Sequence, residues 1–507
     1  MDHLLCGLAA NPALPTALLD RLIATADADT LAELADRPDL SRAQAVALAA
    51  RDEDSVSRLV LSGLLTAADV DPARQPSAAI TLLDERAGDP SWARLLATDP
   101  AVDRRERLAA CPDLPPEVTA LLGADPVIRV VAELALWTTA DSAARLAEHP
   151  HADVRRSVAA NTATPPAVLA MLLTGDGLPP ARWCSVCDHD PVPFEHDPHC
   201  PRLNCGLPPG AACDGSHQST VHAIQQAALA NPATPPAACA GFTDHPSALL
   251  RRELACRTDL LASTYTRLAE DPIPWTRSTL AANPAIDETL MRRLADDEGH
   301  DVRRSLVHHP RLPLDLLTLL VDSVRIGPVL LPRVATASAQ EVNELVRSPS
   351  STARMLLAQR RDLPAEVRDT LAADPDAKVV ASVAAHPGLS EAQLRAMLDR
   401  HGDRVAAMLA ANPDAPSALL TDLAHRNPPA LKALRAISRH PNATASALLV
   451  CLTDRRARQA AAGHPALPPS VLAGLLGDED WQVVEAAAAN PVLPRAVIEQ
   501  AVVRPVA

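Results

Sequence analysis

The residues with the clearest chemistry are four cysteines in one short segment. Cys184 and Cys187 form a C-x2-C pair, and Cys200 and Cys205 form a C-x4-C pair after the spacer 188–199. Two close thiolate pairs can surround one tetrahedral metal ion, and a spacer of this length lets the second pair fold back over the first. We therefore predict a zinc site. Four protein ligands leave no open position for water, so the predicted role is structural and not catalytic.

Other residues of the same segment leave the ligand set open. Cys213, His217 and His199 are further candidate ligands, whereas His189 and His196 are interpreted as solvated loop residues. The stretch from Cys213 to His217 resembles the CDGSH signature of small two-iron, two-sulfur proteins. That resemblance implies a cluster held by three cysteines and one histidine, although the C-x4-C pair stands where the signature has C-x-C. An iron–sulfur cluster is thus the alternative to zinc, and unligated thiols or a transient disulfide are a third interpretation.

The cysteine-rich segment interrupts a chain that otherwise repeats one unit, written most clearly in 153–172. Val154 and Val158 lie on one side of a predicted first helix, and a turn without apolar periodicity follows. We expect Thr164 to cap a second helix and Pro165 to occupy its first position, where a missing N–H costs nothing.

The predicted start of the second helix recurs along the whole chain, mostly at intervals of 26 residues, and such a period indicates a solenoid. The positions are Pro15, Ser41, Pro115, Pro165, Pro235, Leu261, Asp287, Pro313, Pro364, Ser390, Pro416, Thr444, Pro468 and Pro494. Degenerate units are expected to fill the gap from Ser41 to Pro115. The last helix is expected to cap an exposed end of the core.

A second column of residues stands four positions before these starts. It consists of Asn11, Arg37, Cys111, Asn161, Asn231, Arg257, Asn283, His309, Arg360, His386, Asn412, His440, His464 and Asn490. We expect the first helix of each unit to stop there, because most of these residues precede a proline. We interpret the polar ones as partners for backbone groups left free between helices. The alternative is a binding ribbon whose histidines respond to pH. The Asp-Val-Arg-Arg copies at 153 and 301 are expected to be exposed helix starts.

The pattern V-R-x-x-V-A-x-N-P-x-T-P-x-x-x-L, present in 154–169 and 224–239, resembles the leucine-rich repeat variant family. The resemblance implies a right-handed superhelix in which each unit pairs an α-helix with a second short helix, often 3-10. Some members of the family carry a cysteine-rich module with an iron–sulfur cluster at the N-terminus, whereas the segment here is internal. A HEAT-like solenoid is the nearest competitor, but its units are longer.

The predicted fold is therefore an all-α, right-handed α-solenoid with a small irregular cysteine-rich insert. Its parts are N-terminal repeats (1–175), the insert (176–217) and C-terminal repeats (218–507). With 48% hydrophobic but only 2% aromatic residues, the core must be built of small side chains. Trp92 and Trp137 are expected to fill it where alanine leaves space. The cysteines outside the insert are expected to be buried, namely Cys6, Cys111, Cys239, Cys256 and Cys451.

Charge and composition limit the classes of partner. The formal net charge of −15 argues against a nucleic-acid partner, because lysine and arginine carry non-specific affinity for phosphates. We find no secretory signal and no apolar run near the roughly 20 residues that cross a membrane, so we expect a cytoplasmic protein.

The function we predict from the sequence is a non-enzymatic scaffold that binds a protein partner of unknown identity, because no nucleophile has a base at an assignable position. Two alternatives remain. One is a redox or metal sensor with an iron–sulfur insert, and the other is a HEAT-like nucleic-acid-associated protein, which would need a continuous arginine face.

Overall fold

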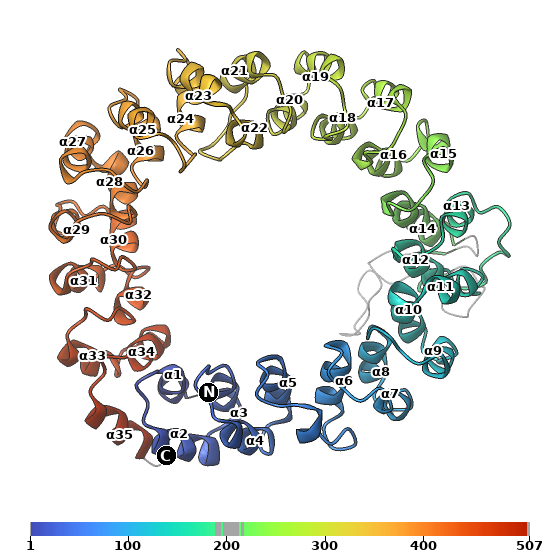
Figure 1. Cartoon of the computed structure of the whole chain (residues 1–507), viewed down its shortest axis with the longest axis horizontal. Coiled ribbons are helices and arrows are strands. Elements are labelled where there is room, and N and C mark those ends of the chain that lie inside the picture. Colours follow the sequence, from blue (N-terminus) through green and yellow to red (C-terminus); the bar gives the residue numbers. More distant parts are fainter. Residues whose placement is uncertain (1, 188–193, 196–211, 214–216, 504–507) are drawn as a thin grey trace. The chain divides into compact units, whose positions relative to one another are not determined.

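The computed structural model describes residues 2–187, 194–195, 212–213 and 217–503, and these residues are predominantly helical. Helices alternate between a first and a second helix of each repeat, and along 102–307 and 351–437 the first helices of successive repeats pack against one another (Figure 1). No strand occurs in 11–41 or 231–494, all of which is described. The prediction of an all-α solenoid is confirmed.

The first helices of the repeats are α1 (His3–Ala10), α3 (Ala28–Ala35), α5 (Glu53–Leu61), α6 (Pro76–Asp84), α8 (Val102–Ala109), α10 (Ile128–Trp137), α12 (Ala152–Ala160), α14 (Gln218–Ala230), α16 (Ala248–Cys256), α18 (Pro274–Ala281), α20 (His300–Val307), α22 (Pro332–Ala335), α24 (Ser351–Leu357), α26 (Ala377–Val383), α28 (Asp403–Ala410), α30 (Leu431–Ile437), α32 (Arg458–Ala462) and α34 (Trp481–Ala488).

The second helices are α2 (Thr16–Thr25), α4 (Arg42–Ala49), α7 (Trp92–Leu96), α9 (Pro116–Gly123), α11 (Ala140–Leu146), α13 (Pro166–Thr174), α15 (Pro236–Cys239), α17 (Ala262–Leu268), α19 (Glu288–Ala295), α21 (Leu314–Ser323), α23 (Ala339–Val346), α25 (Ala365–Ala372), α27 (Glu391–His401), α29 (Ser417–Ala424), α31 (Ala445–Cys451), α33 (Pro469–Leu475) and α35 (Arg495–Val503). A 3-10 turn, η1 (Ala67–Asp69), stands in place of one second helix, and another, η2 (Ala240–Phe242), extends α15. In the insert, β1 (Phe194–Glu195) pairs antiparallel with β2 (Ala212–Cys213).

The second helices begin one residue later than the sequence predicted. Pro165 has extended backbone angles (φ −58°, ψ 139°) and is the N-cap of α13, so Pro166 is the first helical residue. The hydroxyl of Thr164 does not cap this helix. It donates to the carbonyl of Val158 (2.6 Å) and so satisfies the end of the first helix. The phase of the repeat was right, but the roles of these two residues were wrong.

The asparagine that ends many first helices joins each repeat to the one before it. Asn283 is buried, and its Nδ2 donates to the carbonyls of Ala255 (2.7 Å) and Arg257 (2.6 Å). Its Oδ1 accepts from the N–H of Ala285 (2.8 Å) and closes the turn. The same three bonds occur at Asn11, Asn161, Asn231, Asn412 and Asn490.

In other repeats, histidine or arginine at this position also donates hydrogen bonds to carbonyls of the preceding repeat. The Nε2 of His440 lies 2.7 Å from the carbonyl of Asn412, to which it donates. Arg257 donates to the carbonyls of Leu229 and Asn231, both at 2.9 Å. These side chains are buried, which confirms that they satisfy backbone groups between helices and argues against an exposed binding ribbon.

A second column of contacts, which sequence reasoning missed, links the repeats through ion pairs. Arg277 donates to the carbonyl of Asp271 in its own repeat (2.7 Å) and to both carboxylate oxygens of Asp297 in the next (2.7 and 3.0 Å). Burial alone would raise the pKa of Asp297, but the bonds from Arg277 and from the N–H of Gly299 hold it below its ordinary value. Equivalent pairs are Arg105–Asp125, Arg251–Asp271 and Arg354–Asp374.

The apolar stripes meet in a core of small side chains. Leu316, Leu320, Leu419 and Leu472 are all buried, as their helical spacing predicts. Two expectations about the core were wrong. Trp137 is 60% exposed and donates from Nε1 to Glu133 on its own helix, and Cys256 is exposed at the end of α16. The alanine-rich helices pack closely enough that no large aromatic filler is needed at Trp137.

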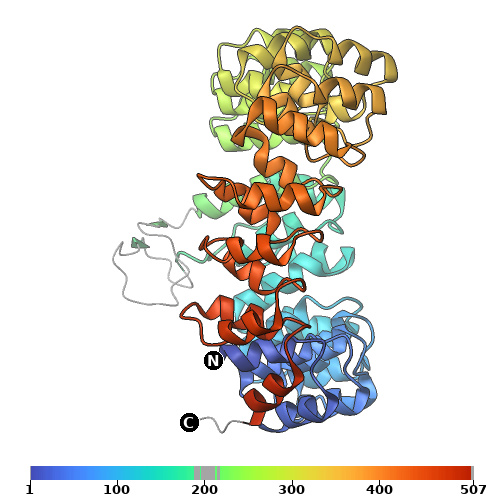
Figure 2. The same ribbon diagram turned by 90° about the vertical axis from the view of Figure 1, so that its left-hand side faces the viewer.

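The contacts divide the chain into two compact units. Unit 1 comprises Met1–Leu64 and Pro310–Ala507, and unit 2 comprises Leu65–His309. Within unit 1 the helix pairs from α27 to α34 follow one another as layers (Figure 2).

Unit 1 also joins the first repeat to the last. Helix α1 packs against α34 (Figure 1), and Asn11 donates to the carbonyls of Ala488 (2.7 Å) and Asn490 (2.9 Å), as in any consecutive pair of repeats. The Nδ1 of His3 lies 2.8 Å from the carboxylate of Glu485. Helix α35 packs on α1 and α2, so it does not cap a free end of the core as expected.

Candidate metal centre

The stack of repeats continues past the insert without a break, so the insert projects from an uninterrupted stack. Helix α14, which follows the insert, packs directly on α12, which precedes it. Asn231 after α14 donates to the carbonyls of Ala159 and Asn161, both at 2.9 Å. The hydrogen bonds between these two repeats are therefore the same as those between other repeats. The helices α13 and α14 lie on either side of the insert.

The first part of the insert is fastened to the turn before α12 by backbone hydrogen bonds. The N–H groups of Arg182 (2.8 Å) and Trp183 (3.3 Å) donate to the carbonyl of Pro150. The N–H of Ala152 donates to the carbonyl of Trp183 (2.8 Å), which forms a parallel bridge between His151 and Trp183. This bridge fixes the backbone immediately before Cys184.

Two side chains at the start of α12 hold the insert as well. The carboxylate of Asp153 accepts from the N–H of Ser185 (2.7 Å), and Arg155 donates to the carbonyl of Pro179 (2.7 Å). Both Asp153 and Arg155 are buried, so the expectation of an exposed helix start was wrong here. In other repeats the equivalent arginine pairs with an aspartate 20 residues later. That position is Gly175 in this repeat, and a carbonyl of the insert takes the place of the carboxylate.

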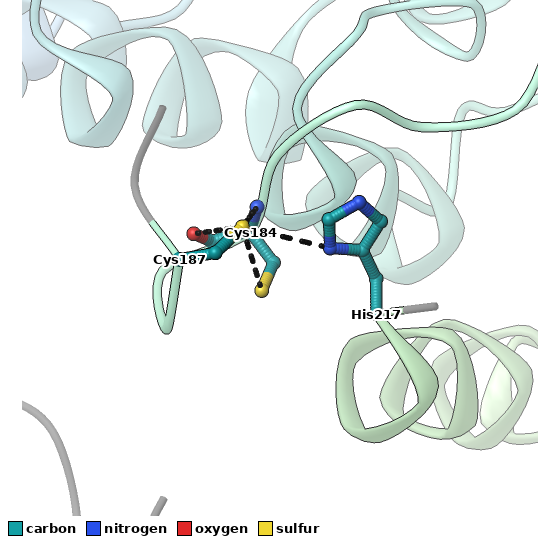
Figure 3. A group of neighbouring side chains, drawn as sticks. All are labelled: Cys184, Cys187 and His217. Atoms are coloured by element: carbon teal, nitrogen blue, oxygen red, sulfur yellow. Dashed lines mark hydrogen bonds between the residues drawn. The ribbon is translucent and has the colours of Figure 1, made fainter. Parts of the chain in front are cut away.

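Cys184, Cys187 and His217 come together at this anchored base (Figure 3). The two sulfurs are 3.8 Å apart, and the sulfur of Cys187 lies 3.7 Å from Nδ1 of His217. One donor atom from each residue lies within 4.8 Å of the other two. The side chains are 1%, 4% and 5% exposed, respectively. Such a group of buried thiols and imidazole has the composition of a metal site.

The distances agree with the edges of a coordination tetrahedron. Sulfur and nitrogen ligands lie about 2.3 Å and about 2.0–2.1 Å from a zinc ion, so two sulfurs should be about 3.8 Å apart and a sulfur and a nitrogen about 3.6 Å. The observed separations are 3.8 Å between the sulfurs of Cys184 and Cys187 and 3.7 Å between Cys187 and His217. The residues present fit three ligands of a single ion.

Backbone geometry directs His217 toward the cysteines. His217 is the residue before α14 and has a left-handed conformation (φ 54°, ψ 27°), which is uncommon for a residue with a side chain. Figure 3 shows the ring extending from the start of α14 toward the turn that carries the cysteine pair. A residue held in such a conformation at a cluster of donor atoms supports a functional role for it.

The remaining predicted ligands cannot be placed in the same way. Cys200, Cys205 and His199 lie outside the described residues, and for Cys213 the structure describes only the backbone, in β2. The structure thus brings together two of the four thiols proposed first and the histidine named as a further candidate. The anchoring roles of Pro150, Asp153 and Arg155 were not foreseen. Their only signal in the sequence is the missing aspartate at Gly175.

Comparisons with known proteins add little to this description. A scan against protein-family models finds no match, and a search of curated proteins finds none. The similar solved structures include a homology model of the full-length AP-3 complex in an intermediate open conformation, with 11% identity over 95% of this chain and 86% of that chain and a TM-score of 0.20.

They also include the Pds5–Scc1 complex, with 13% identity over 93% of this chain and 62% of that chain and a TM-score of 0.13. At such TM-scores the likeness carries no argument about function. The resemblance of the repeat to the leucine-rich repeat variant family stays a prediction.

The helices themselves bear on the question of a membrane. Among the described residues, none of the helices combines the length and the apolar character that crossing a membrane requires.

Proposed function

We propose that this chain is a non-enzymatic repeat scaffold that binds a protein partner, and that its insert is folded around one structural zinc ion. The observation that carries the metal proposal is the convergence of three buried donor atoms within 4.8 Å on backbone that is bonded to α12. A small insert with little apolar core gains much of its folding free energy from such an ion.

In this proposal Cys184, Cys187 and His217 provide three ligands, and one of Cys200, Cys205 and Cys213 provides the fourth. When bound, zinc would hold these side chains and, with a closed set of four, would take no part in catalysis. The scaffold positions two ligands through the bridge at Trp183 and the third through α14. The ion would therefore connect the start of the insert to its end.

An iron–sulfur cluster is the second candidate, and one observation favours it. His217, the last residue of the CDGSH-like stretch, is the histidine that lies beside Cys184 and Cys187. The protein ligands of a two-iron cluster are, however, divided between two irons. Three donor atoms around one point match a single ion better, and for this reason we place zinc first.

Purification without oxygen followed by elemental analysis and an absorption spectrum tests the metal proposal. We expect about one zinc ion per chain and no visible absorption. The double variant Cys184→Ser/Cys187→Ser should lose the metal and keep most of its helicity, because the repeats have their own core. Cys256→Ser, at an exposed cysteine outside the insert, is the control and should keep the metal.

Two results would contradict the zinc proposal. Iron with sulfide-to-iron absorption bands would replace it with a cluster. Full metal content in Cys184→Ser/Cys187→Ser would show that the three converging residues are not the ligands.

The scaffold proposal is supported by the stacked repeats of each unit, and the paired arginines between repeats argue against the nucleic-acid alternative. Arg105, Arg251, Arg277 and Arg354 are bonded to carboxylates, so they do not form the free arginine face which that alternative requires. Chemical crosslinking of the full chain in extracts of its source cells tests the proposal. Reproducible crosslinks from folded repeats to other proteins are expected, and crosslinks within the chain alone would contradict it.

A further inference from the structure

One repeat of unit 1 has a shortened first helix, and this leaves a hollow beside the next repeats. Helix α22 (Pro332–Ala335) has only four residues and is preceded by the irregular segment 324–331, which contains Gly327, Pro328 and then Pro332. Proline and glycine disfavour continuation of a helix, which explains why a full first helix does not form here. The stack next to α24 is therefore lined by a loop where a helix would otherwise pack.

The hollow has a volume of about 560 Å³ and a largely apolar lining. Its lining includes Ile326 and Pro328 from the loop, Met355 from α24, Ala381 from α26 and Met408 from α28. Met408 is 39% exposed, and Val329 and Leu330, which follow in the loop, are 40% and 45% exposed. Apolar surface of this kind favours the burial of apolar side chains, and flexible methionines adapt to different ones.

Positive charges lie in and near this hollow, whose lining includes Lys378 and Arg361. Lys378, Arg404 and Lys432 are each the second residue of a first helix, in α26, α28 and α30, one repeat apart. They include both lysines of the chain. Within the described residues, none of the three side chains has a carboxylate at salt-bridge distance.

One carboxylate, Asp376, lies close enough to interact with the charge of Lys378. Lys378 and Arg404 both line a second hollow of about 780 Å³, which shares Ser351, Lys378 and Ala381 with the first. The carboxylate of Asp376, also in its lining, accepts from the backbone N–H of Lys378 (2.8 Å). Arg354 in the same lining is paired with Asp374. Among the described residues, the cations of these two linings without a carboxylate at salt-bridge distance are thus Lys378, Arg361 and Arg404, in a chain whose net charge is −15.

We propose that this surface binds an acidic peptide segment of a partner protein, with an apolar side chain in the 560 Å³ hollow and carboxylates against Lys378 and Arg404. The proposal rests on the proposed scaffold function and specifies its partner. Charge complementarity decides the class of occupant, because apolar contacts supply affinity while unpaired cations at the rim select negative charge. One repeat between successive cations suits an extended or helical segment that crosses several first helices.

Fluorescence anisotropy of labelled peptides on the full chain tests this inference. The probe is a short peptide with one leucine flanked by glutamates, and its controls carry lysines for the glutamates or alanine for the leucine. We expect the acidic leucine peptide to bind most tightly and its affinity to fall with added salt. The variant Lys378→Glu/Arg404→Glu should weaken binding about tenfold, since it removes two attractive charges from the surface and introduces two repulsive ones.

A matched control separates local from global charge. Arg21→Glu/Arg347→Glu changes the net charge by the same amount at two exposed arginines, one on α2 and one directly after α23, and it should leave binding unchanged. Met408→Glu, at an exposed position of the hollow, should weaken binding even where both cations remain. Circular dichroism of each variant shows whether its fold is kept.

Several outcomes would overturn the inference. These are equal binding of the acidic and basic peptides, equal affinities in the two charge-reversed variants, preference for a single-stranded oligonucleotide, and self-association of the chain that Lys378→Glu/Arg404→Glu abolishes. If partner crosslinks persist in that variant, the scaffold proposal stands and the inference alone fails. If no partner crosslinks form with the wild-type chain, the scaffold proposal itself fails.

Discussion

At the scale of single residues, one side chain at the end of many first helices joins two repeats. Asn283 donates two hydrogen bonds to backbone carbonyls of the preceding repeat and accepts one from its own turn. Ala255 lies in the last turn of α16 and Arg257 directly follows that helix, where the last four carbonyl groups have no partner within the helix. A buried acceptor without a donor costs more than a hydrogen bond contributes, so the energetic role of this residue is to prevent that loss.

Asn283→Ala should lower the free energy of unfolding by about 2–4 kcal/mol, because it leaves the carbonyls of Ala255 and Arg257 without their donor. Denaturant unfolding followed by circular dichroism measures the change. Asn343→Ala removes an exposed asparagine from α23 and should stay within about 0.5 kcal/mol of wild type. Equal losses of unfolding free energy in the two variants would show that the hydrogen bonds of Asn283 to the preceding repeat contribute no additional stability.

His386 makes part of the stability depend on pH. Burial, with Arg361 and Arg368 nearby, holds the pKa of His386 below its ordinary value. Its contribution is therefore complete above the unfolded pKa of about 6.5 and is lost as the pH falls toward the folded pKa, since the unfolded chain binds the proton more tightly. In the variant His386→Asn this part of the acid sensitivity should disappear. Thermal unfolding of both proteins from pH 8 down to pH 5 measures it, and parallel curves would refute the assignment.

At the scale of elements, α12 serves both the repeat stack and the insert. The same Asp-Val-Arg-Arg sequence begins α12 and recurs in α20, but only in α12 are the aspartate and the first arginine buried under the insert. Asp153 accepts the N–H of Ser185, which lies between the two cysteines of the candidate centre. Asp153 is thus a positioning residue for the turn that carries the thiols.

Asp153→Ala should weaken zinc binding about 10- to 100-fold, as the loss of groups that orient ligands commonly does. Competition with a chromogenic chelator measures the affinity. Asp301→Ala, at the same position of the exposed copy, should have no effect. Unchanged zinc affinity in Asp153→Ala would mean that the backbone bridge at Trp183 holds the turn alone.

Sequence patterns could predict the elements because residues that start or stop helices recur at the same position of each repeat. The recurring proline phase located the second helices to within one residue, and the shift arose because Pro165 caps α13 and does not enter it. The arginine–aspartate pairs were visible in principle, since Arg105 and Arg277 are each followed 20 residues later by an aspartate, Asp125 and Asp297.

The candidate centre was harder to predict. Cys184 and Cys187 follow from their spacing, but the choice of His217 depends on where α14 begins. The first helix of a repeat and the position of its N-cap are fixed by packing on α12, which is a contact between segments distant in sequence. No local pattern in the insert contains that information.

At the scale of the whole molecule, the first and last repeats share one interface within unit 1. Gly7 lies against α34, and a Cβ atom there would collide with the carbonyl oxygen of Glu485 and lie 2.7 Å from Cβ of Ala488. The ring of His3 also stacks on Trp481, with centroids 4.5 Å apart. Glycine is therefore required at this close approach.

Gly7→Ala should destabilise the contact between α1 and α34 by about 1–3 kcal/mol through overpacking. Hydrogen exchange should accelerate in both helices, although only one carries the substitution. Gly474→Ala in α33, where an added Cβ meets nothing within 4 Å, should instead stabilise the chain by about 0.5–1 kcal/mol. Faster exchange in α1 alone would indicate loss of a helix and not of the contact.

The contact between Asn11 and the carbonyl of Ala488 spans 477 residues of chain. A ribosome adds about 5–20 residues each second, so α1 leaves it roughly 24–95 seconds before its partner helix exists. During that interval the apolar side of α1 that later faces α34 is open to other nascent chains. We therefore expect a chaperone that covers the apolar side of α1 during translation to raise the yield of folded chain.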